Sequence, residues 1–165
     1  MAKNQKGIAY LSLLFAVALG GMALAGSGVV WQIEVRREKE KQLLFAGEQY
    51  RQAIASYYER SPDTPQYPAK LEDLLLDRRF PMPVRHLRRL YPEPMMADGQ
   101  WHLIRQQDRI VGVASRSTEV PIKVGGFPEA QSEFEGARQY AHWQFIARPS
   151  GGRQPVNKTG DAPDR

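Results

Sequence analysis

Hydrophobic and polar positions divide the chain into one uninterrupted apolar run and a mostly polar remainder. No charged residue occurs between Ile8 and Trp31. As an α-helix this run would reach about 36 Å at about 1.5 Å per residue, which is enough to cross a bilayer core of about 30 Å. Because Lys3 and Lys6 precede it, the positive-inside rule places the N-terminus in the cytoplasm and the rest of the chain outside. The pattern predicts one membrane-spanning helix joined to a soluble part.

The helical pattern continues beyond the apolar run. Residues 32–60 contain no proline and are rich in Glu, Lys, Arg, Gln and Leu, which are good helix formers. Apolar or small residues recur here at steps of four and three, namely Leu43, Gly47, Tyr50, Ile54 and Tyr57. We therefore expect one helix from about Ile8 to about Arg60, whose second half packs this apolar stripe on a small domain.

Prolines interrupt the chain after the long helix. Residues 61–68 hold three of them and predict a turn-rich break. Three leucines on one face predict a short helix over residues 69–80, and one further helical turn is expected around 84–90.

The following segments have the patterns of β-strands. The runs QWHLIRQ (100–106) and RIVGVASR (109–116) are apolar and β-branched, and they predict a hairpin whose neighbour Trp101 lies in the core. VPIKV (120–124) and HWQFIA (142–147), which contains Trp143, are weaker strand candidates. The tail, residues 149–165, is rich in Gly, Pro, Asn and Asp, and we expect it to be disordered.

Composition narrows the class of protein. The chain has 165 residues, a formal net charge of +5 and no cysteine. The missing cysteines exclude disulfides, a lipoprotein anchor and thiolate metal sites, and they suit an oxidising compartment such as a bacterial periplasm. The positive charge is mild, whereas a general nucleic-acid binder more often has a concentrated basic face. We expect no nucleic-acid partner.

Candidate catalytic and metal-binding residues are few. His86, His102 and His142 lie in different segments without metal-ligand spacing, so surface or half-buried histidines are expected. Glu72 and Asp73 are adjacent, which points their carboxylates about 100° apart on a helix. The chain has no GxSxG, phosphate loop or GxGxxG. The sequence predicts no enzyme activity, no cofactor and no metal.

Arginines form the clearest polar cluster, in the stretch DRRFPMPVRHLRRL. They are Arg78, Arg79, Arg85, Arg88 and Arg89. They could contact phosphates on nucleic acid or lipid, pair with acidic groups on a neighbouring subunit, or form local salt bridges to Asp77, Glu72 and Glu93. We favour the last two interpretations, with Arg85, Arg88 and Arg89 as candidate subunit contacts, because the segment lacks the aromatic platform of single-strand binders.

Several of these pieces together resemble a known family. A short basic leader ending in glycine (KNQKG) is followed at once by IAYLSLLFAVAL and a long amphipathic helix, then by QYP…LEDLL, HLRRLYPEPM…W and VGVAS. Over most of residues 1–148 this order resembles the type IV pilin-like pseudopilins of bacterial type II secretion systems, above all the major pseudopilin. The resemblance implies an α+β fold in which a long N-terminal helix packs on a small antiparallel β-sheet.

The resemblance also implies a domain organisation. Residues 1–7 would be a leader, 8–31 the membrane or filament-core half of the helix, 32–60 its amphipathic half, and 61–148 a periplasmic pilin-like domain. The protein would cross the bacterial inner membrane once, with its N-terminus in the cytoplasm.

Processing and assembly follow from the same resemblance. A prepilin peptidase would cut after Gly7 and methylate the new N-terminus at Ile8. The subunit would then leave the inner membrane for a periplasmic filament that supports protein export. Its partners would be other pseudopilin subunits, the inner-membrane secretion platform and membrane lipid.

Two departures from the family pattern concern assembly and calcium. Among the assembly positions Tyr10, Leu11 and Ser12, the last usually holds glutamate, which favours a minor, tip or divergent role; Ile8 replaces the usual phenylalanine. The loop that carries several calcium ligands in major pseudopilins offers only Glu119 here. Because Ca²⁺ takes six to eight oxygen ligands, we expect no bound calcium.

Two other fates of the N-terminus stay open. Ala23 and Ala25 satisfy the small-x-small rule of signal peptidase, which would give a mature periplasmic domain starting at Gly26. The apolar run could also be an uncut anchor. In either case the alternative function is an exported or membrane-anchored binding module whose arginine cluster grips an anionic partner.

Overall fold

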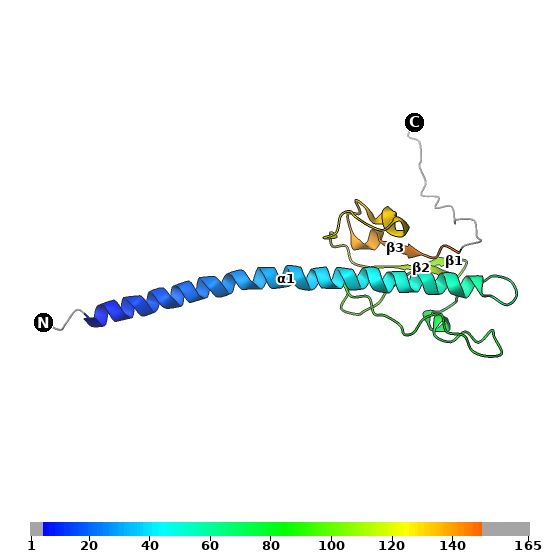
Figure 1. Ribbon diagram of the computed structural model, residues 1–165, viewed down its shortest axis with the longest axis horizontal. Helices are drawn as coiled ribbons and strands as arrows, with labels where there is room; N and C mark the ends of the chain where they lie inside the picture. Colours follow the sequence, from blue (N-terminus) through cyan, green and yellow to red (C-terminus); the bar gives the residue numbers. More distant parts are fainter. Residues whose placement is uncertain (1–4, 150–165) are drawn as a thin grey trace, which may run out of the picture. The chain divides into compact units, whose positions relative to one another are not determined.

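The computed structural model describes residues 5–149, with side chains described at 10–19 and 31–149. One long helix precedes three strands and three short 3₁₀ turns (Figure 1). These elements are α1 (Gln5–Glu59), η1 (Leu71–Leu74), β1 (His102–Gln106), β2 (Arg109–Ala114), η2 (Glu129–Phe134), η3 (Tyr140–His142) and β3 (Gln144–Ile146). The expected α+β fold, with a helix packed on a small antiparallel sheet, is confirmed in this form.

The chain divides into two compact units, Met1–Lys41 and Gln42–Arg165. The helix begins at Gln5 rather than near Ile8, so its first turn lies inside the expected leader. Gln5 and Lys6 are good helix formers, and a single glycine after them is not enough to stop a helix. Residues 1–4 and 150–165 lie outside the described residues, so the expectation of a disordered tail stays a prediction.

The expected membrane span is not found in the structure. Within the part of the chain that the structure describes, no helix is both long enough and apolar enough to cross a membrane. The side chains at positions 20–30, inside the expected span 8–31, lie outside the described residues.

The sheet is antiparallel, with strand order β1-β2-β3. Leu103 pairs with Val113, which in turn pairs with Phe145. A two-residue turn joins β1 to β2, with positive φ at Gln107 (48°) and Asp108 (62°), as a tight hairpin turn requires. The predicted hairpin is confirmed.

The two weaker strand candidates have different outcomes. HWQFIA contributes β3, which is only three residues long. The prediction for VPIKV is wrong, because residues 120–124 form no strand. Pro121 in its middle is buried and has no N–H to donate to a sheet ladder.

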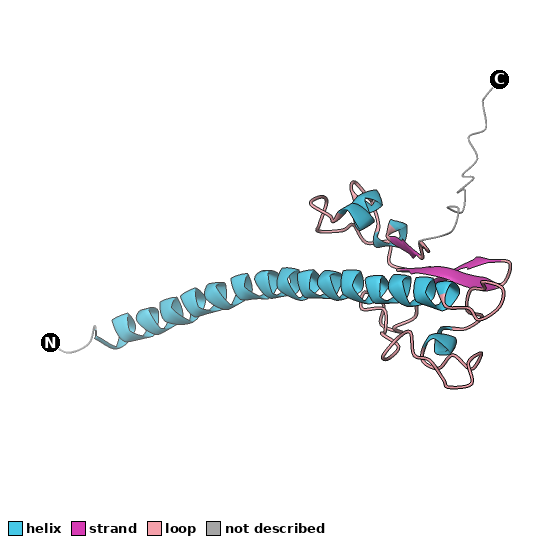
Figure 2. Cartoon of the chain, turned by 45° about the vertical axis from the view of Figure 1, so that its right-hand side comes forward, coloured by secondary structure: helices cyan, strands magenta, loops and turns pink. Residues whose placement is uncertain are grey.

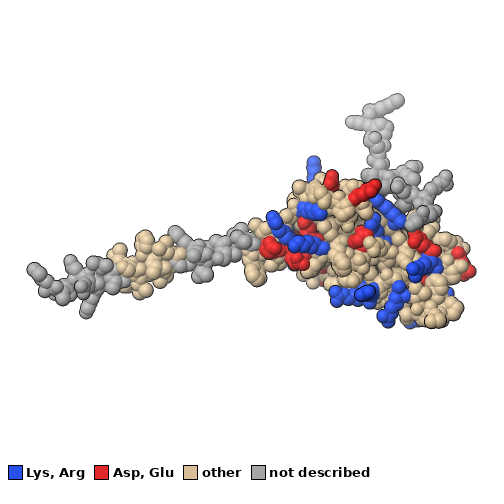
Figure 3. All heavy atoms as spheres, in the orientation of Figure 1, with Lys and Arg blue, Asp and Glu red and all other residues tan. Residues whose placement is uncertain are grey.

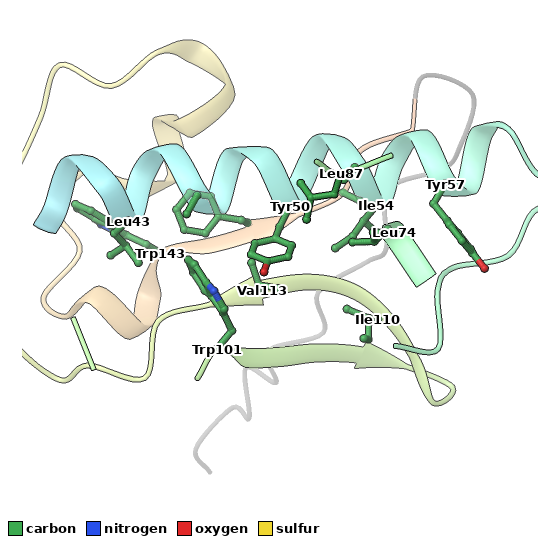
Figure 4. Packing of buried hydrophobic residues seen from close by; sticks show 14 of the residues in the cluster. Leu43, Tyr50, Ile54, Tyr57, Leu74, Leu87, Trp101, Ile110, Val113 and Trp143 are labelled. Atoms are coloured by element: carbon green, nitrogen blue, oxygen red, sulfur yellow. The ribbon is translucent and has the colours of Figure 1, made fainter. Parts of the chain in front are cut away.

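The core lies between the sheet and the part of α1 that belongs to the second unit (Figure 4). The predicted stripe is confirmed: Leu43, Tyr50, Ile54 and Tyr57 are between 0% and 6% exposed. At Gly47 the helix approaches β3 so closely that a Cβ atom there would overlap the Phe145 ring. The two tryptophans expected in the core, Trp101 (8%) and Trp143 (0%), are also buried.

The segment between α1 and β1 corrects two helix predictions. The helix expected over 69–80 is only the single turn η1, and residues 84–90 form no helical turn. The carbonyl oxygen of Leu74 accepts instead from the backbone N–H groups of His86 and Leu87, both at 2.9 Å. An α-helix would need that carbonyl for the residue four positions later. Long-range backbone hydrogen bonds therefore replace local helix, and η1 and η2 lie on opposite sides of α1 (Figures 1 and 2).

Candidate functional site

The first candidate site is the exposed part of α1 at residues 10–19, which we call the apolar segment. Its large side chains are between 52% and 68% exposed, namely Tyr10, Leu11, Leu13, Leu14, Phe15, Val17 and Leu19. At about 100° per residue these positions surround the helix rather than forming one stripe. A helix that is apolar on every side is typical of a lipid environment or of the core of a larger assembly.

The residues expected to act in processing and assembly lie in or next to this segment. Tyr10 is 64% and Leu11 68% exposed, and Ser12 is exposed as well. Gly7 and Ile8 are helical, but their side chains lie outside the described residues. The apolar segment therefore exposes large apolar side chains of the residues expected to act in assembly.

The second candidate site is a set of exposed arginines, which we call the basic surface: Arg78, Arg85, Arg88 and Arg89. The Arg89 guanidinium lies 5.0 Å from the centre of the Tyr91 ring. None of the four forms a salt bridge with another described residue. Figure 3 shows basic side chains with few acidic neighbours along the lower edge of the face in view, where the segment between α1 and β1 lies in Figure 1.

Arg79 is used differently from its neighbours. Its Nε and Nη2 atoms donate to the two carboxylate oxygens of Asp77 at 2.9 and 2.7 Å. Its other contacts are with α1 and the residues after it: the guanidinium stacks on the Tyr57 ring at 3.6 Å and donates to the Tyr57 carbonyl and to Ser61 Oγ. Arg79 therefore fastens the segment to the end of α1.

The expected local salt bridges are confirmed only for Asp77. Glu72 forms none with the described residues. Glu93 is buried, and its carboxylate accepts from Ser115 Oγ at 2.9 Å and from the Met96 amide at 2.5 Å. The arginines of the basic surface therefore remain available to other molecules.

His86 has intermediate exposure as a residue, within the surface or half-buried range that was expected, but its imidazole lies inside the protein. Its side chain is 0% exposed, and it joins Ser56 of α1 to Asp77. Ser56 Oγ lies 2.9 Å from Nδ1, and Asp77 Oδ2 lies 3.3 Å from Nε2. Since the carboxylate can only accept, Nε2 carries the proton and Nδ1 accepts from the serine hydroxyl.

The ionisation of this cluster follows from its surroundings. Burial lowers the pKa of His86 and outweighs the opposing effect of Asp77, while Arg60 and Arg79 lower it further. Burial alone would raise the pKa of Asp77, but hydrogen bonds from Arg79 and His86 and the charge of Arg79 lower it overall. The stable form is a neutral imidazole beside an ionised carboxylate.

Ser56, His86 and Asp77 are the residue types of a hydrolase catalytic triad, but the similarity does not extend beyond residue type. Both the imidazole and the carboxylate are 0% exposed, so a substrate has no access to the histidine. The carboxylate is occupied by Arg79. Little in the sequence marks this trio, because 30 and 9 residues separate its hydrogen-bonded pairs. The cluster ties the basic surface to α1.

A shallow hollow of about 380 Å³ lies beside the core and is lined in part by Tyr50, Lys70, Leu71, Trp101 and Arg105. Burial raises the pKa of the Tyr50 phenol to about 12, so the phenol stays protonated near neutrality. Among the described residues, no group of three or more His, Cys, Asp or Glu side chains is placed to hold a metal ion.

Comparisons with known proteins add no family to this picture. The sequence matches no protein-family model and no curated protein, and the structure matches no solved structure.

Proposed function

We propose that this chain is a structural subunit of the pseudopilin type, which assembles through its N-terminal helix into a type II secretion or related pilus-like filament that supports protein export. The observation that carries the proposal is the contrast along α1. Residues 10–19 expose large apolar side chains on every side, whereas the helix from Leu43 to Tyr57 buries its stripe on the sheet.

Water is an unfavourable environment for the apolar segment. Removing apolar surface from water contributes about 25 cal/mol per Å², so an all-round apolar helix is poorly matched to water. The stripe from Leu43 to Tyr57 is already covered by the chain's own sheet. Residues 10–19 therefore need an external partner, which in this proposal is first the inner-membrane lipid and then the helices of neighbouring subunits.

In the proposed pathway, a prepilin peptidase cuts after Gly7 and methylates Ile8. Residues 8–31 hold the subunit in the inner membrane, with the C-terminal domain in the periplasm, until the secretion platform moves it into a filament. Ser12 provides no carboxylate to pair with a neighbour's N-terminal amine, which favours a minor or tip position.

The proposal is tested by the mass and N-terminal sequence of the protein purified from its native membrane. A chain that starts at methylated Ile8 is the expected result. A start at Gly26 would mean a Sec-exported domain, and an intact Met1 would mean a permanent anchor; either would overturn the proposal.

Two matched variants sharpen this test. Gly7→Leu places a bulky side chain at the proposed cut and is expected to leave Met1 intact. Ala25→Leu blocks only the signal-peptidase alternative and is expected to leave the start at Ile8 unchanged. The reverse pattern would indicate removal of residues 1–25.

A further inference from the structure

The basic surface is mounted on an anchored backbone. Asp77 and Val84 form a backbone bridge, with the Asp77 amide donating at 2.8 Å. Next to it, Leu87 is 4% exposed and His86 has its side chain inside the protein. Arg85 and Arg88 therefore flank two inward-pointing residues. Because the backbone between these two arginines is already ordered, a partner that binds them loses less conformational entropy, which favours specific docking.

The composition of this surface is that of a protein–protein interface. Its cations are all arginine, and it includes the side chain of Met82, which is 81% exposed. Arginine and methionine are enriched in protein interfaces, where lysine is depleted. A surface for non-specific attraction to nucleic acid or lipid requires only positive charge.

A complementary surface lies on the same domain. Glu129, Glu133 and Glu135, in and just after η2, are exposed, and we call them with Val124 the acidic surface. Val124 is 69% exposed. Glu133 has one contact with Arg148 at 2.7 Å, in a pair that is itself largely exposed. Each surface thus has an excess of one charge beside an exposed apolar side chain, and Arg148 is a cation next to Glu133 on the acidic surface.

The two surfaces are on opposite sides of α1. The basic surface follows η1 in the chain and the acidic surface includes η2, and these two turns lie on opposite sides of the helix in both views (Figures 1 and 2). The opposite charges of the two surfaces therefore cannot pair with each other within one copy. Two different, mutually complementary surfaces on opposite sides of a subunit form a head-to-tail contact, which gives a ring or an open series of copies rather than a two-fold dimer.

From these observations we infer that the basic surface of one copy docks on the acidic surface of a second copy, head to tail. The place of this contact in a filament rests on the proposed function. The inference adds which surfaces of the C-terminal domains meet. Arg88 and Arg89 face Glu129 and Glu133 of the next copy, and Met82 packs near its Val124.

The test uses two full-length variants in detergent, each followed by sedimentation. Arg88→Glu/Arg89→Glu reverses the charge at the two contact positions of the basic surface, and Glu129→Lys/Glu133→Lys does so at the two contact positions of the acidic surface. Each variant alone is expected to self-associate about tenfold or more weakly than the parent chain, because charge pairs at close contact are strongly coupled. Mixed in equal amounts they are expected to associate again, since the reversed charges at the contact positions of one variant are opposite in sign to those of the other.

The matched control is Lys70→Glu/Arg109→Glu, which reverses two exposed charges outside both surfaces and is expected to leave self-association unchanged. Circular dichroism checks that every variant is folded. If the mixture does not associate, or if only the arginine variant weakens association, the inference is overturned; the second result would mean that the arginines bind some other anion.

The N-terminal mass of the same samples separates the two proposals. If the chain is not cut after Gly7 but the mixture still associates, the proposed function fails and this contact stands. If the chain is cut but the mixture stays dissociated, the contact fails and the proposed function stands.

Discussion

The phenol oxygen of Tyr50 makes two hydrogen bonds to the backbone of Tyr91: it donates to the carbonyl oxygen at 3.0 Å and accepts from the amide nitrogen at 2.9 Å. Trp101 Nε1 donates to the same carbonyl at 2.8 Å. Tyr91 lies outside the strands, so a side chain of α1 makes the two backbone hydrogen bonds that a neighbouring strand would otherwise make. This contact fixes the segment that follows the basic surface.

Tyr50→Phe is expected to destabilise the domain by about 1–3 kcal/mol. The Tyr91 carbonyl keeps its bond to Trp101, but the partly buried Tyr91 amide loses its acceptor. The free energy of unfolding of the full chain measures the loss. Tyr58→Phe is the matched control, because the Tyr58 ring stacks on Tyr67 at 4.4 Å and its hydroxyl has no hydrogen bond to a described residue. Equal effects of the two substitutions would contradict the argument.

Gly47→Ala is expected to destabilise the protein although alanine is the better helix former. The added Cβ overlaps the Phe145 ring, which is 1% exposed and has little room to move. Overpacking of this kind costs about 1–3 kcal/mol, against about 1 kcal/mol gained in helix propensity. Thermal unfolding measures the net effect. Phe145→Leu should be less harmful in the Gly47→Ala background than in the parent, and a purely additive result would disprove the close contact.

The stripe was predictable because it repeats with the helical period, and the hairpin because two apolar runs flank a short polar turn. The stripe from Leu43 to Tyr57 follows the helical repeat, and the β1 and β2 runs are β-branched on either side of a short turn. The stripe buries one face of the helix, whereas β2 is buried at five consecutive positions, so a continuous apolar run rather than an alternation marks it in the sequence.

The segment from 69 to 90 was not predictable in the same way, because its partners are distant in the sequence. Leu74 has a helical neighbourhood, yet its carbonyl bonds to His86 and Leu87. The burial of His86 depends on Ser56, which is 30 residues away. The arginine cluster itself was visible in the sequence, but only the fold separates Arg79, which is used internally, from the four exposed arginines.

Arg79→Ala is expected to cost about 3 kcal/mol, because it leaves the buried carboxylate of Asp77 without its cation. Arg79→Lys keeps the charge but loses the bidentate contact with Asp77 and the stacking on Tyr57, so an intermediate loss of stability is expected. The free energy of unfolding is the measurement. Arg78→Ala, on the neighbouring exposed arginine, is the control and should change it by less than about 0.5 kcal/mol. A harmless Arg79→Ala would mean that Asp77 is held by other groups.

The stability of the folded domain is expected to fall as the pH drops below about 6.5, the ordinary pKa of histidine. Burial lowers the pKa of His86 in the folded state, so the unfolded chain binds a proton that the folded chain does not. The loss has a limiting slope of about 1.4 kcal/mol per pH unit. The lowered pKa of Asp77 adds a second loss only at lower pH, below the ordinary aspartate pKa of about 3.9.

Chemical unfolding at several pH values between 5 and 8 measures this dependence. His86→Gln can still donate to Asp77 but does not titrate, so its stability should change less over this range. His102→Gln, at an exposed position of β1, should keep the pH dependence of the parent chain. A parent protein that is as stable at pH 5 as at pH 8 would contradict the assignment of a buried neutral imidazole.

Leu14→Lys is expected to separate the roles of the two units of the chain. Leu14 is 52% exposed in the apolar segment, and the domain core consists of residues from Leu43 onward. The thermal unfolding of the domain should therefore be unchanged. If the apolar segment lies in lipid, a lysine near its centre carries a penalty of roughly 2.5–3.5 kcal/mol, and carbonate extraction should release more of the variant than of the parent from native membranes. Gln66→Lys, which adds a positive charge at an exposed position outside the apolar segment, controls for the change in charge and should not increase release. Unaltered membrane retention of Leu14→Lys would mean that residues 10–19 contact something other than lipid.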